Sequence, residues 1–328
     1  MKLAKILATA LAFSISVVSS QAAWNTVVSV AAGTFTYGNF KGQTTTAVNM
    51  GTYEVNWGDF KTIRSWAATN GFDLANVGSG NGDSATVPVE NISWYDTVKW
   101  LNAATLYSNA NLSTSYTPVY STGTLTATAF SSALTKATCT VQNGHNLKSN
   151  NWVKITGASV AGYNLTAPIT VVNNTQFSYT TVVSGTGAAT SGLITVLYTT
   201  GDITPTVSTA ATGWRLPTEK EWEWSALAGG SLTYSGSATA STVAWTRDNL
   251  TNGQGAQAVG GKTANAYGLY DMSGNVNEWC FDDATPLFGR SVRGGGWVSD
   301  SGSSRTLNRG YRDPSKNEAG FGFRPARN

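Results

Sequence analysis

Apolar residues three or four positions apart predict two amphipathic helices, over roughly 57–69 and 94–106. The second is preceded by Ser93, whose hydroxyl can cap it, with Asp96 three residues on as an acidic partner. The apolar positions that carry the period are Phe60, Ile63, Trp66 and Ala67 in the first and Trp94, Val98, Trp100, Leu101 and Ala104 in the second. Both helices should therefore pack one face against a core.

A third helix is predicted to open after Pro217, because Thr218 followed by Glu221 fits a capping box. The pair Gly229-Gly230 should end it. Residues 24–60 show short alternations of apolar and polar positions between turn residues, which is typical of strands.

Residues 123–197 have a different pattern. Several β-branched runs are separated by Asn/Gly turns, no helical period appears, and the charged residues are three lysines (Lys136, Lys148, Lys154). Short strands at regular spacing predict a small all-β module. Similar flanks, Tyr-Ser-Thr-Gly at 120–123 and Tyr-Thr-Thr-Gly at 198–201, indicate insertion into a loop, a site where insertions are tolerated. Residues 143–158 resemble a β-module of phage structural proteins.

The first 22 residues have the features of a secretory signal peptide: Lys2 and Lys5, an apolar stretch over 6–18, and a small-x-small site at 20–22. A buried N-terminal helix is the alternative, but it would have no cap and no polar face. No later apolar run is long enough to span a membrane. We therefore expect a secreted or periplasmic protein.

Composition narrows the possible partners. Removing Lys2 and Lys5 leaves 19 basic residues against 18 acidic ones, a net charge of +1, which does not favour nucleic-acid binding. Charged residues make up only 12% of the chain, and 12 Trp and 13 Tyr are present. Cys139 lies in the module and Cys280 outside it, so we expect no bridge between them.

Several motifs, in order, resemble the formylglycine-generating enzyme (sulfatase-modifying factor) family. They are the stretches at 32–38, 53–56, 87–96, 213–224, 265–276, 292–297 and 320–324, among them Gly213-Trp214-Arg215-Leu216-Pro217-Thr218-Glu219 and Gly320-Phe321-Gly322-Phe323-Arg324. The resemblance implies an irregular α+β domain with a C-type-lectin-like fold. This domain would comprise 23–122 and 198–328, interrupted by the module at 123–197.

The family's oxidases use two cysteines after a Gly-Gly-aromatic motif to hold copper. Alignment on Gly294-Gly295-Gly296-Trp297 places Ser299 and Ser304 at these positions. Serine lacks the soft, readily deprotonated sulfur that cuprous copper needs, so neither copper binding nor catalytic residues are expected here. Related iron-dependent enzymes need a histidine cluster, and this chain has only His145, which we interpret as a turn residue.

The resemblance also implies a calcium site. Its ligands would be the side chains of Asp271 and Glu278 and the backbone carbonyls of Gly274 and Val276, since calcium favours hard oxygens on a tight loop. The family usually has Asn where this chain has Asp271. The alternative is a metal-free loop whose carboxylates cap backbone amides.

Other polar residues allow two interpretations. Trp297, Arg309, Tyr311 and Arg312 gather near the C-terminus, where they either anchor loops through ion pairs or line a groove for a polar ligand. Glu219, Glu221 and Glu223 fit the start of a capped helix better than acid–base catalysis. Cys280 has no nearby histidine in the sequence and is interpreted as a buried structural thiol.

Three functional hypotheses follow. The first is a non-catalytic binding or structural protein, with an extracellular or periplasmic protein or glycan as its ligand. The second is an enzyme of an unassigned branch of the family. The third is a ligand-display protein whose C-terminal loops at 297–318 vary between copies. Since a fold alone does not set a function, the site must decide between them.

Overall fold

The computed structural model describes residues 23–181, 187–251, 254–285 and 289–328. The expected leader, 1–22, lies outside the described residues. The helices are α1 (Trp57–Thr69), α2 (Trp94–Asn111), α3 (Glu219–Leu227) and the short α4 (Ala240–Val243), with 3-10 turns η1 (Asn81–Asp83), η2 (Ala161–Tyr163) and η3 (Ser301–Ser304). Within the described part, no helix combines the length and hydropathy needed to cross a membrane.

The caps of the helices confirm the sequence signals. Ser93 Oγ accepts the Asp96 amide at 3.0 Å at the start of α2. Thr218 and Glu221 form both halves of a capping box on α3. The chain leaves α3 through Ala228 in a left-handed conformation, followed by Gly229 at a φ of 77°.

Helix α2 runs five residues past its predicted end at 106. Leu106 and Ser108 are buried, and the Ser108 hydroxyl donates to the Ala104 carbonyl at 2.8 Å. Beyond Leu106 the helix is only partly buried, and Ser108, Asn109 and Asn111 are weak helix formers that carry no apolar period, so the sequence does not mark its end.

The strands form four sheets. The three-stranded sheet has the order β1-β4-β17, the four-stranded sheet has the order β15-β14-β13-β16, and β2 pairs with β3. Their bounds are β1 (Val27–Val30), β2 (Gly33–Thr34), β3 (Thr44–Thr45), β4 (Val48–Gly51), β13 (Asn277–Thr285), β14 (Gly289–Arg293), β15 (Gly310–Arg312), β16 (Phe321–Gly322) and β17 (Ala326–Arg327). Separate helices beside mainly antiparallel strands make this an α+β fold, as predicted.

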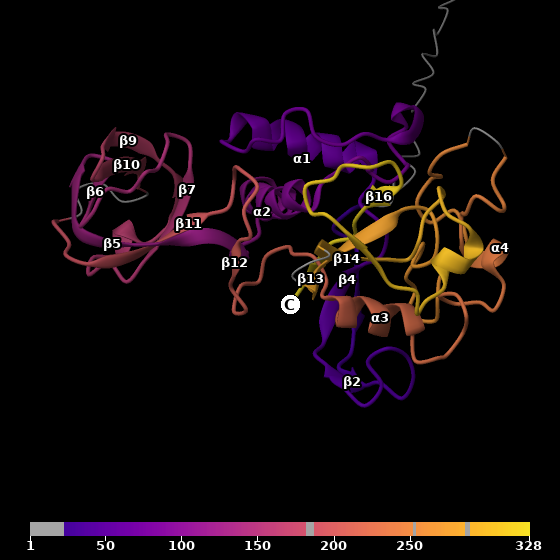
Figure 1. Cartoon of the computed structure of the whole chain (residues 1–328). Helices are drawn as coiled ribbons and strands as arrows, with labels where there is room; N and C mark the ends of the chain where they lie inside the picture. The colour runs from indigo at the N-terminus through magenta and orange to yellow at the C-terminus, as the bar shows by residue number, and fades with distance from the viewer. Residues whose placement is uncertain (1–22, 182–186, 252–253, 286–288) are drawn as a thin grey trace, which may run out of the picture.

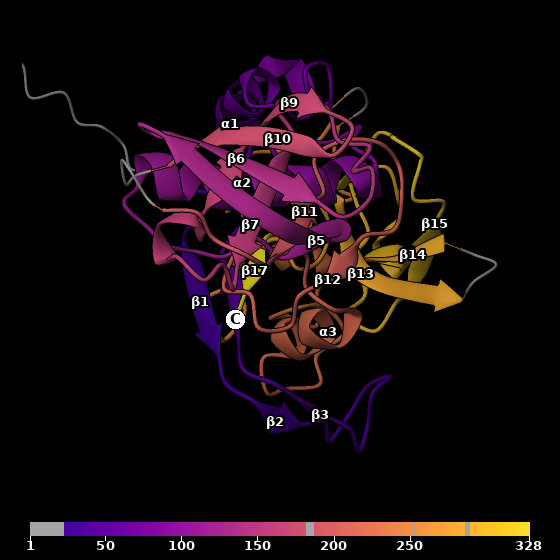
Figure 2. The same cartoon turned by 90° about the vertical axis from the view of Figure 1, so that its left-hand side faces the viewer.

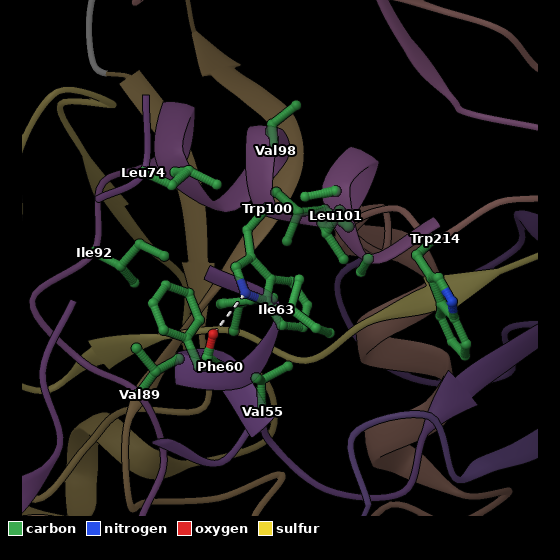
Figure 3. Close-up of a cluster of buried hydrophobic side chains, with 14 of the residues drawn as sticks. Val55, Phe60, Ile63, Leu74, Val89, Ile92, Val98, Trp100, Leu101 and Trp214 are labelled. Atoms are coloured by element: carbon green, nitrogen blue, oxygen red, sulfur yellow. Dashed lines mark hydrogen bonds between the residues drawn. The ribbon is translucent and has the colours of Figure 1, made fainter. Parts of the chain in front are cut away.

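The main core lies between α1, α2 and the C-terminal strands. Phe60 stacks on Trp100 with ring centroids 5.4 Å apart, and Trp100 donates its indole N–H to the Phe60 carbonyl at 3.3 Å (Figure 3). Trp100 also meets Phe323 edge-on at 5.3 Å. The first and last parts of the chain thus share one core.

The remaining sheet forms most of the inserted module, seen at the left of Figure 1 and facing the viewer in Figure 2. Its order is β8-β7-β11-β5-β6-β10-β9, with β12 paired to β5. The bounds are β5 (Tyr120–Ala133), β6 (Lys136–Val141), β7 (Trp152–Thr156), β8 (Thr166–Pro168), β9 (Thr170–Asn173), β10 (Gln176–Thr180), β11 (Gly192–Leu197) and β12 (Thr206–Val207).

The module encloses a hydrophobic cluster of its own, with buried residues from Ala127 to Ile194. It leaves and re-enters the domain through paired strands, since Thr124 lies opposite Thr195. It also touches α1, because the Trp152 indole donates to the Asn70 carbonyl at 2.8 Å. Independent folding of the module stays a prediction.

Candidate functional site

The glycine-rich loop after β14 makes a close backbone approach. Gly294 and Gly295 have φ values of 85° and 66°, which favour glycine. A Cβ on Gly295 would lie only 2.6 Å from Ser304 Oγ and 2.8 Å from the Ser303 carbonyl carbon. The loop therefore packs directly against η3, at Ser303 and Ser304.

A small pocket of about 180 Å³ opens beside this loop, and we call it the serine pocket. Ser299 is half-buried and lines it, whereas Ser304 is buried behind Gly295 and its hydroxyl has no hydrogen-bond partner. Its other polar lining residues include Asn277, Ser303, Asn308 and Arg312. Serines, asparagines and two arginines, Arg293 and Arg312, thus surround a space suited to a polar group.

The donors of the serine pocket do not fit copper. Ser299 and Ser304 offer neutral hydroxyl oxygens where a thiolate pair would be needed. Within the described ranges, no three His, Cys, Asp or Glu side chains are grouped to hold a metal ion. His145 lies in the module, where its Nδ1 accepts the Leu147 amide at 3.0 Å. It is therefore not placed to act as a base for these serines.

Of the four candidate ligand-binding residues, Arg312 alone lines the serine pocket. Arg312 is 49% exposed, its carboxylate partner Glu318 lies 3.5 Å away, and its Nη1 donates to the Tyr311 carbonyl at 3.0 Å. Trp297 donates its indole N–H to Glu90 at 3.0 Å and is half-buried.

Arg309 and Tyr311 are not among the residues that line the serine pocket. Arg309 forms two hydrogen bonds of 2.6 Å with Glu219, so its charge is already matched. Its guanidinium lies 5.8 Å from the Tyr311 ring. These two side chains therefore belong to a packed surface beside α3.

The acidic residues of α3 are paired with arginines. Arg293 donates to Glu223 at 2.6 Å and to Glu219 at 3.3 Å, and both carboxylates are buried. Burial raises the pKa of Glu219, but the hydrogen bond from Arg309 and the charge of Arg293 together hold it below its usual value. A carboxylate held ionised by two arginines is not poised as a general acid.

The expected calcium ligands lie in and after a tight loop before β13. Asp271 and Gly274 have φ values of 55° and 78°. Both Glu278 oxygens are bonded to Arg324 at 2.6 Å, and one of them also accepts the Trp222 indole N–H at 2.7 Å. Asp271 Oδ2 accepts the Gly260 amide at 2.6 Å, while its Oδ1 is buried without a partner.

A third carboxylate, Glu54, completes this buried cluster and was not predicted. It accepts the Val276 amide at 3.0 Å and the Asn275 side-chain amide at 2.6 Å. Burial, with the negative charges of Asp271 and Glu278, raises its pKa well above the usual value. The sequence signal that could have pointed to Glu54 was its position in the stretch at 53–56, which carries part of the family resemblance.

This geometry does not fit calcium as the resemblance implied. The Glu278 carboxylate already has a guanidinium as its counter-charge, which leaves Asp271 Oδ1 as the one partnerless oxygen among the predicted side-chain ligands. The contacts instead resemble the alternative, in which carboxylates bind loop amides. Calcium binding stays a prediction.

Both cysteines are free and buried, in separate hydrophobic clusters. Burial raises the pKa of Cys139 to about 12. Burial likewise raises the pKa of Cys280 well above its usual value, helped by the charge of Asp282. Neither thiol is activated as a nucleophile.

Two curated proteins are similar to parts of this chain. Chaperone protein LppX of Paenibacillus barcinonensis is 38% identical over 119 residues, covering 29% of this chain and 42% of the relative. Serine/threonine-protein kinase pkn1 of Chlamydia pneumoniae is 34% identical over 135 residues, covering 35% of this chain and 21% of the kinase. The chain thus matches less than half the length of these relatives.

Solved structures share the fold over most of the chain. CarF superposes with a TM-score of 0.59 at 20% identity, covering 92% of this chain and 97% of that one. Treponema denticola variable protein 1 gives 0.56 at 20% identity, with 92% and 94% covered. The family described as "Sulfatase-modifying factor enzyme 1-like domain" matches residues 15–328. The chain therefore belongs to this family of sulfatase-modifying factor proteins, as the motifs indicated.

Proposed function

We propose that the chain is an exported, non-catalytic binding protein that holds a polar group of its ligand in the serine pocket. The observation that carries this proposal is the pair Ser299 and Ser304 beside Gly295, where the family's oxidases have their cysteines. The pocket keeps its place in the fold while its donors lack the chemistry for copper.

The lining suggests what kind of group would bind. Ser299, Ser303 and Asn308 supply neutral donors and acceptors, and Arg312 supplies a positive charge that its distant partner Glu318 matches only weakly. A hydroxyl-rich or carboxylate-bearing group complements these walls. We favour an acidic glycan of the extracellular or periplasmic space over a protein, because the pocket is small and polar.

The catalytic part of the proposal is tested with a sulfatase-type cysteine peptide. The mature protein, incubated with this peptide, copper and oxygen, should form no aldehyde detectable by mass spectrometry. Copper-dependent formylglycine would refute the proposal and favour the enzymatic alternative. Amino-terminal sequencing of the exported protein would test cleavage after residue 22.

The binding part is tested on an array of neutral and acidic glycans. Arg312→Gln should weaken binding of an acidic glycan at least fivefold, since a charge-assisted hydrogen bond is lost. Lys316→Gln is the matched control, because Lys316 is exposed nearby without lining the pocket. Equal losses in the two variants would show that net charge alone attracts the glycan.

Ligand display is a second candidate. Residues within 297–318 supply Val298, Ser299, Ser303, Asn308, Gly310 and Arg312 to the wall of the serine pocket, so variation there would change the ligand without changing the core. One structural neighbour is itself called a variable protein. Sequencing sibling copies would support display if the differences concentrate at 297–318.

A further inference from the structure

A second pocket, of about 470 Å³, lies where the module joins the main domain. We call it the junction pocket. Six parts of the chain line it: the β3–β4 loop, the start of β5, the end of β12 with the segment after it, the start of α3 with the segment before it, the strand β13, and Asn328. It shares no lining residue with the serine pocket. Its volume is in the range of small-molecule sites.

The inner wall of the junction pocket is apolar. Tyr120 stacks on Phe281 with ring centroids 5.6 Å apart, and Val207 and Leu216 add aliphatic surface. Ala47 lies at the exposed rim. Binding of a ligand against such a wall is favoured mainly because apolar surface of the ligand is removed from water.

The charged side chains in the pocket are already paired. Arg215 donates to both Glu221 oxygens, at 2.7 Å and 2.8 Å, and also to the side-chain oxygen of Asn328 at 2.8 Å. A charged ligand would have to leave water without gaining a free counter-charge, which is costly. The pocket therefore favours a neutral ligand.

Tyr120, which forms part of this wall, also carries a buried hydrogen-bond donor. The Tyr120 hydroxyl accepts the Leu216 amide at 2.8 Å, but no acceptor for its own proton occurs among the contacts of the described residues. Tyr120 lines the junction pocket and is 1% exposed, so an acceptor must enter the pocket to reach this hydroxyl. Burial raises the pKa of this hydroxyl, which keeps it protonated as a donor.

From this combination we infer that the junction pocket is a second binding site, for a neutral and largely apolar small molecule whose carbonyl or ether oxygen accepts a hydrogen bond from Tyr120. Because Tyr120 begins β5 and Val207 ends β12, the bound molecule would contact strands that continue into the module. This inference is independent of the serine pocket.

The probe for the test is prodan, a neutral naphthalene with one carbonyl and an emission that shifts to the blue in apolar surroundings. The full-length mature protein should bind it at one saturable site. Ala47→Trp, which fills the pocket from its exposed rim, should weaken binding at least tenfold. Ala68→Trp, at an exposed position on α1 outside the pocket, is the matched control and should not change it.

Two further measurements test the chemistry. Tyr120→Phe should weaken prodan about fivefold, the effect of one neutral hydrogen bond. Thermal melts must show that this variant is folded, because the Leu216 amide loses its acceptor. The anionic probe anilinonaphthalene sulfonate should bind at least tenfold more weakly than prodan.

The inference fails if prodan shows no saturable binding, or if Ala47→Trp binds it as well as the wild type does. Unchanged affinity in a folded Tyr120→Phe protein would overturn the assigned hydrogen bond. Equal affinity for the sulfonate probe would overturn the preference for a neutral ligand.

Discussion

Replacing Asp271 by asparagine should stabilise the protein at neutral pH, although it alters a buried side chain. Asp271, Glu54 and Glu278 are buried together, and Arg324 is the one cation hydrogen-bonded to this group among the described contacts. Asp271 Oδ1 lacks a partner, so its ionised form is poorly compensated. Asparagine keeps an oxygen for the Gly260 amide and removes the charge.

The pKa of Asp271 sets the size of the stabilisation expected from Asp271→Asn. Burial raises it to about 6, although the hydrogen bond from Gly260 and the charge of Arg324 lower it. The unfolded value is about 3.9, and each unit corresponds to about 1.4 kcal/mol, so the difference is worth about 3 kcal/mol. The folded wild type binds the Asp271 proton more tightly than the unfolded chain does. Protonated Asp271 therefore contributes this stabilisation in full below about pH 4, and the wild type loses it as the pH rises through about 6.

Urea unfolding from pH 4.5 to pH 8 measures the effect. The free energy of unfolding of Asp271→Asn minus that of the wild type should rise with pH and level off near 3 kcal/mol above pH 7. Asp202→Asn is the control, because Asp202 is exposed and its ion pair with Lys99 is long, at 3.6 Å. This control should stay within about 0.5 kcal/mol of wild type at every pH.

Unfolding in calcium and in chelator distinguishes the effect of the Asp271 proton from that of the predicted calcium ion. Bound calcium would stabilise the wild type by about 2.7 kcal/mol at a hundredfold excess over its dissociation constant, and Asp271→Asn would lose part of this response. If calcium raises the wild-type free energy of unfolding and chelator lowers it, the proton account is refuted and the calcium prediction is supported. The proton account is also refuted if the difference in free energy of unfolding between Asp271→Asn and the wild type does not change with pH.

Three further changes test the scaffold. Thr218→Ala should cost about 1 kcal/mol in urea unfolding, because the Glu221 amide loses its cap. Arg324→Met should cost about 3–5 kcal/mol by leaving Glu278 buried and unpaired, and a smaller loss in Glu278→Gln/Arg324→Met would show that the unpaired charge is the cause. Deleting 124–196 with a short Gly/Ser join should leave one cooperative melt, since Thr124 and Thr195 are paired neighbours; loss of cooperativity would make the module part of the main core.

The features that could be predicted from the sequence depend on local contacts. The caps at Ser93 and Thr218 each act on an amide three residues away, so their signals are contained in four consecutive residues. Period and turn residues likewise marked α1 and the strands of the module. The end of α2 was missed because its last residues, among them Ser108, Asn109 and Asn111, are weak helix formers without an apolar period.

The buried clusters depend on contacts between distant parts of the chain. Glu54 meets Asn275 across 221 residues, and Glu278 meets Arg324 across 46. The resemblance grouped Asp271 with Glu278 but could not show that an arginine had taken the counter-ion position beside Glu278. The sequence marked the glycine-rich loop beside which the serine pocket opens, because that loop is short and continuous, but of the four residues predicted to line a groove only Arg312 lines this pocket.

The buried carboxylates share a structural role that explains why titration does not mark the candidate site here. A loop-rich fold leaves many amides without strand or helix partners, and buried amides must be paired. Glu54, Glu90, Asp271 and Glu223 each accept a loop amide, at Val276, Gly320, Gly260 and Asn39. Arg324 and Arg293 then balance charge inside two of these clusters. The raised pKa values of Glu54 and Asp271 thus belong to carboxylates that anchor loops, so pockets with unpaired donors are better guides to ligand binding here.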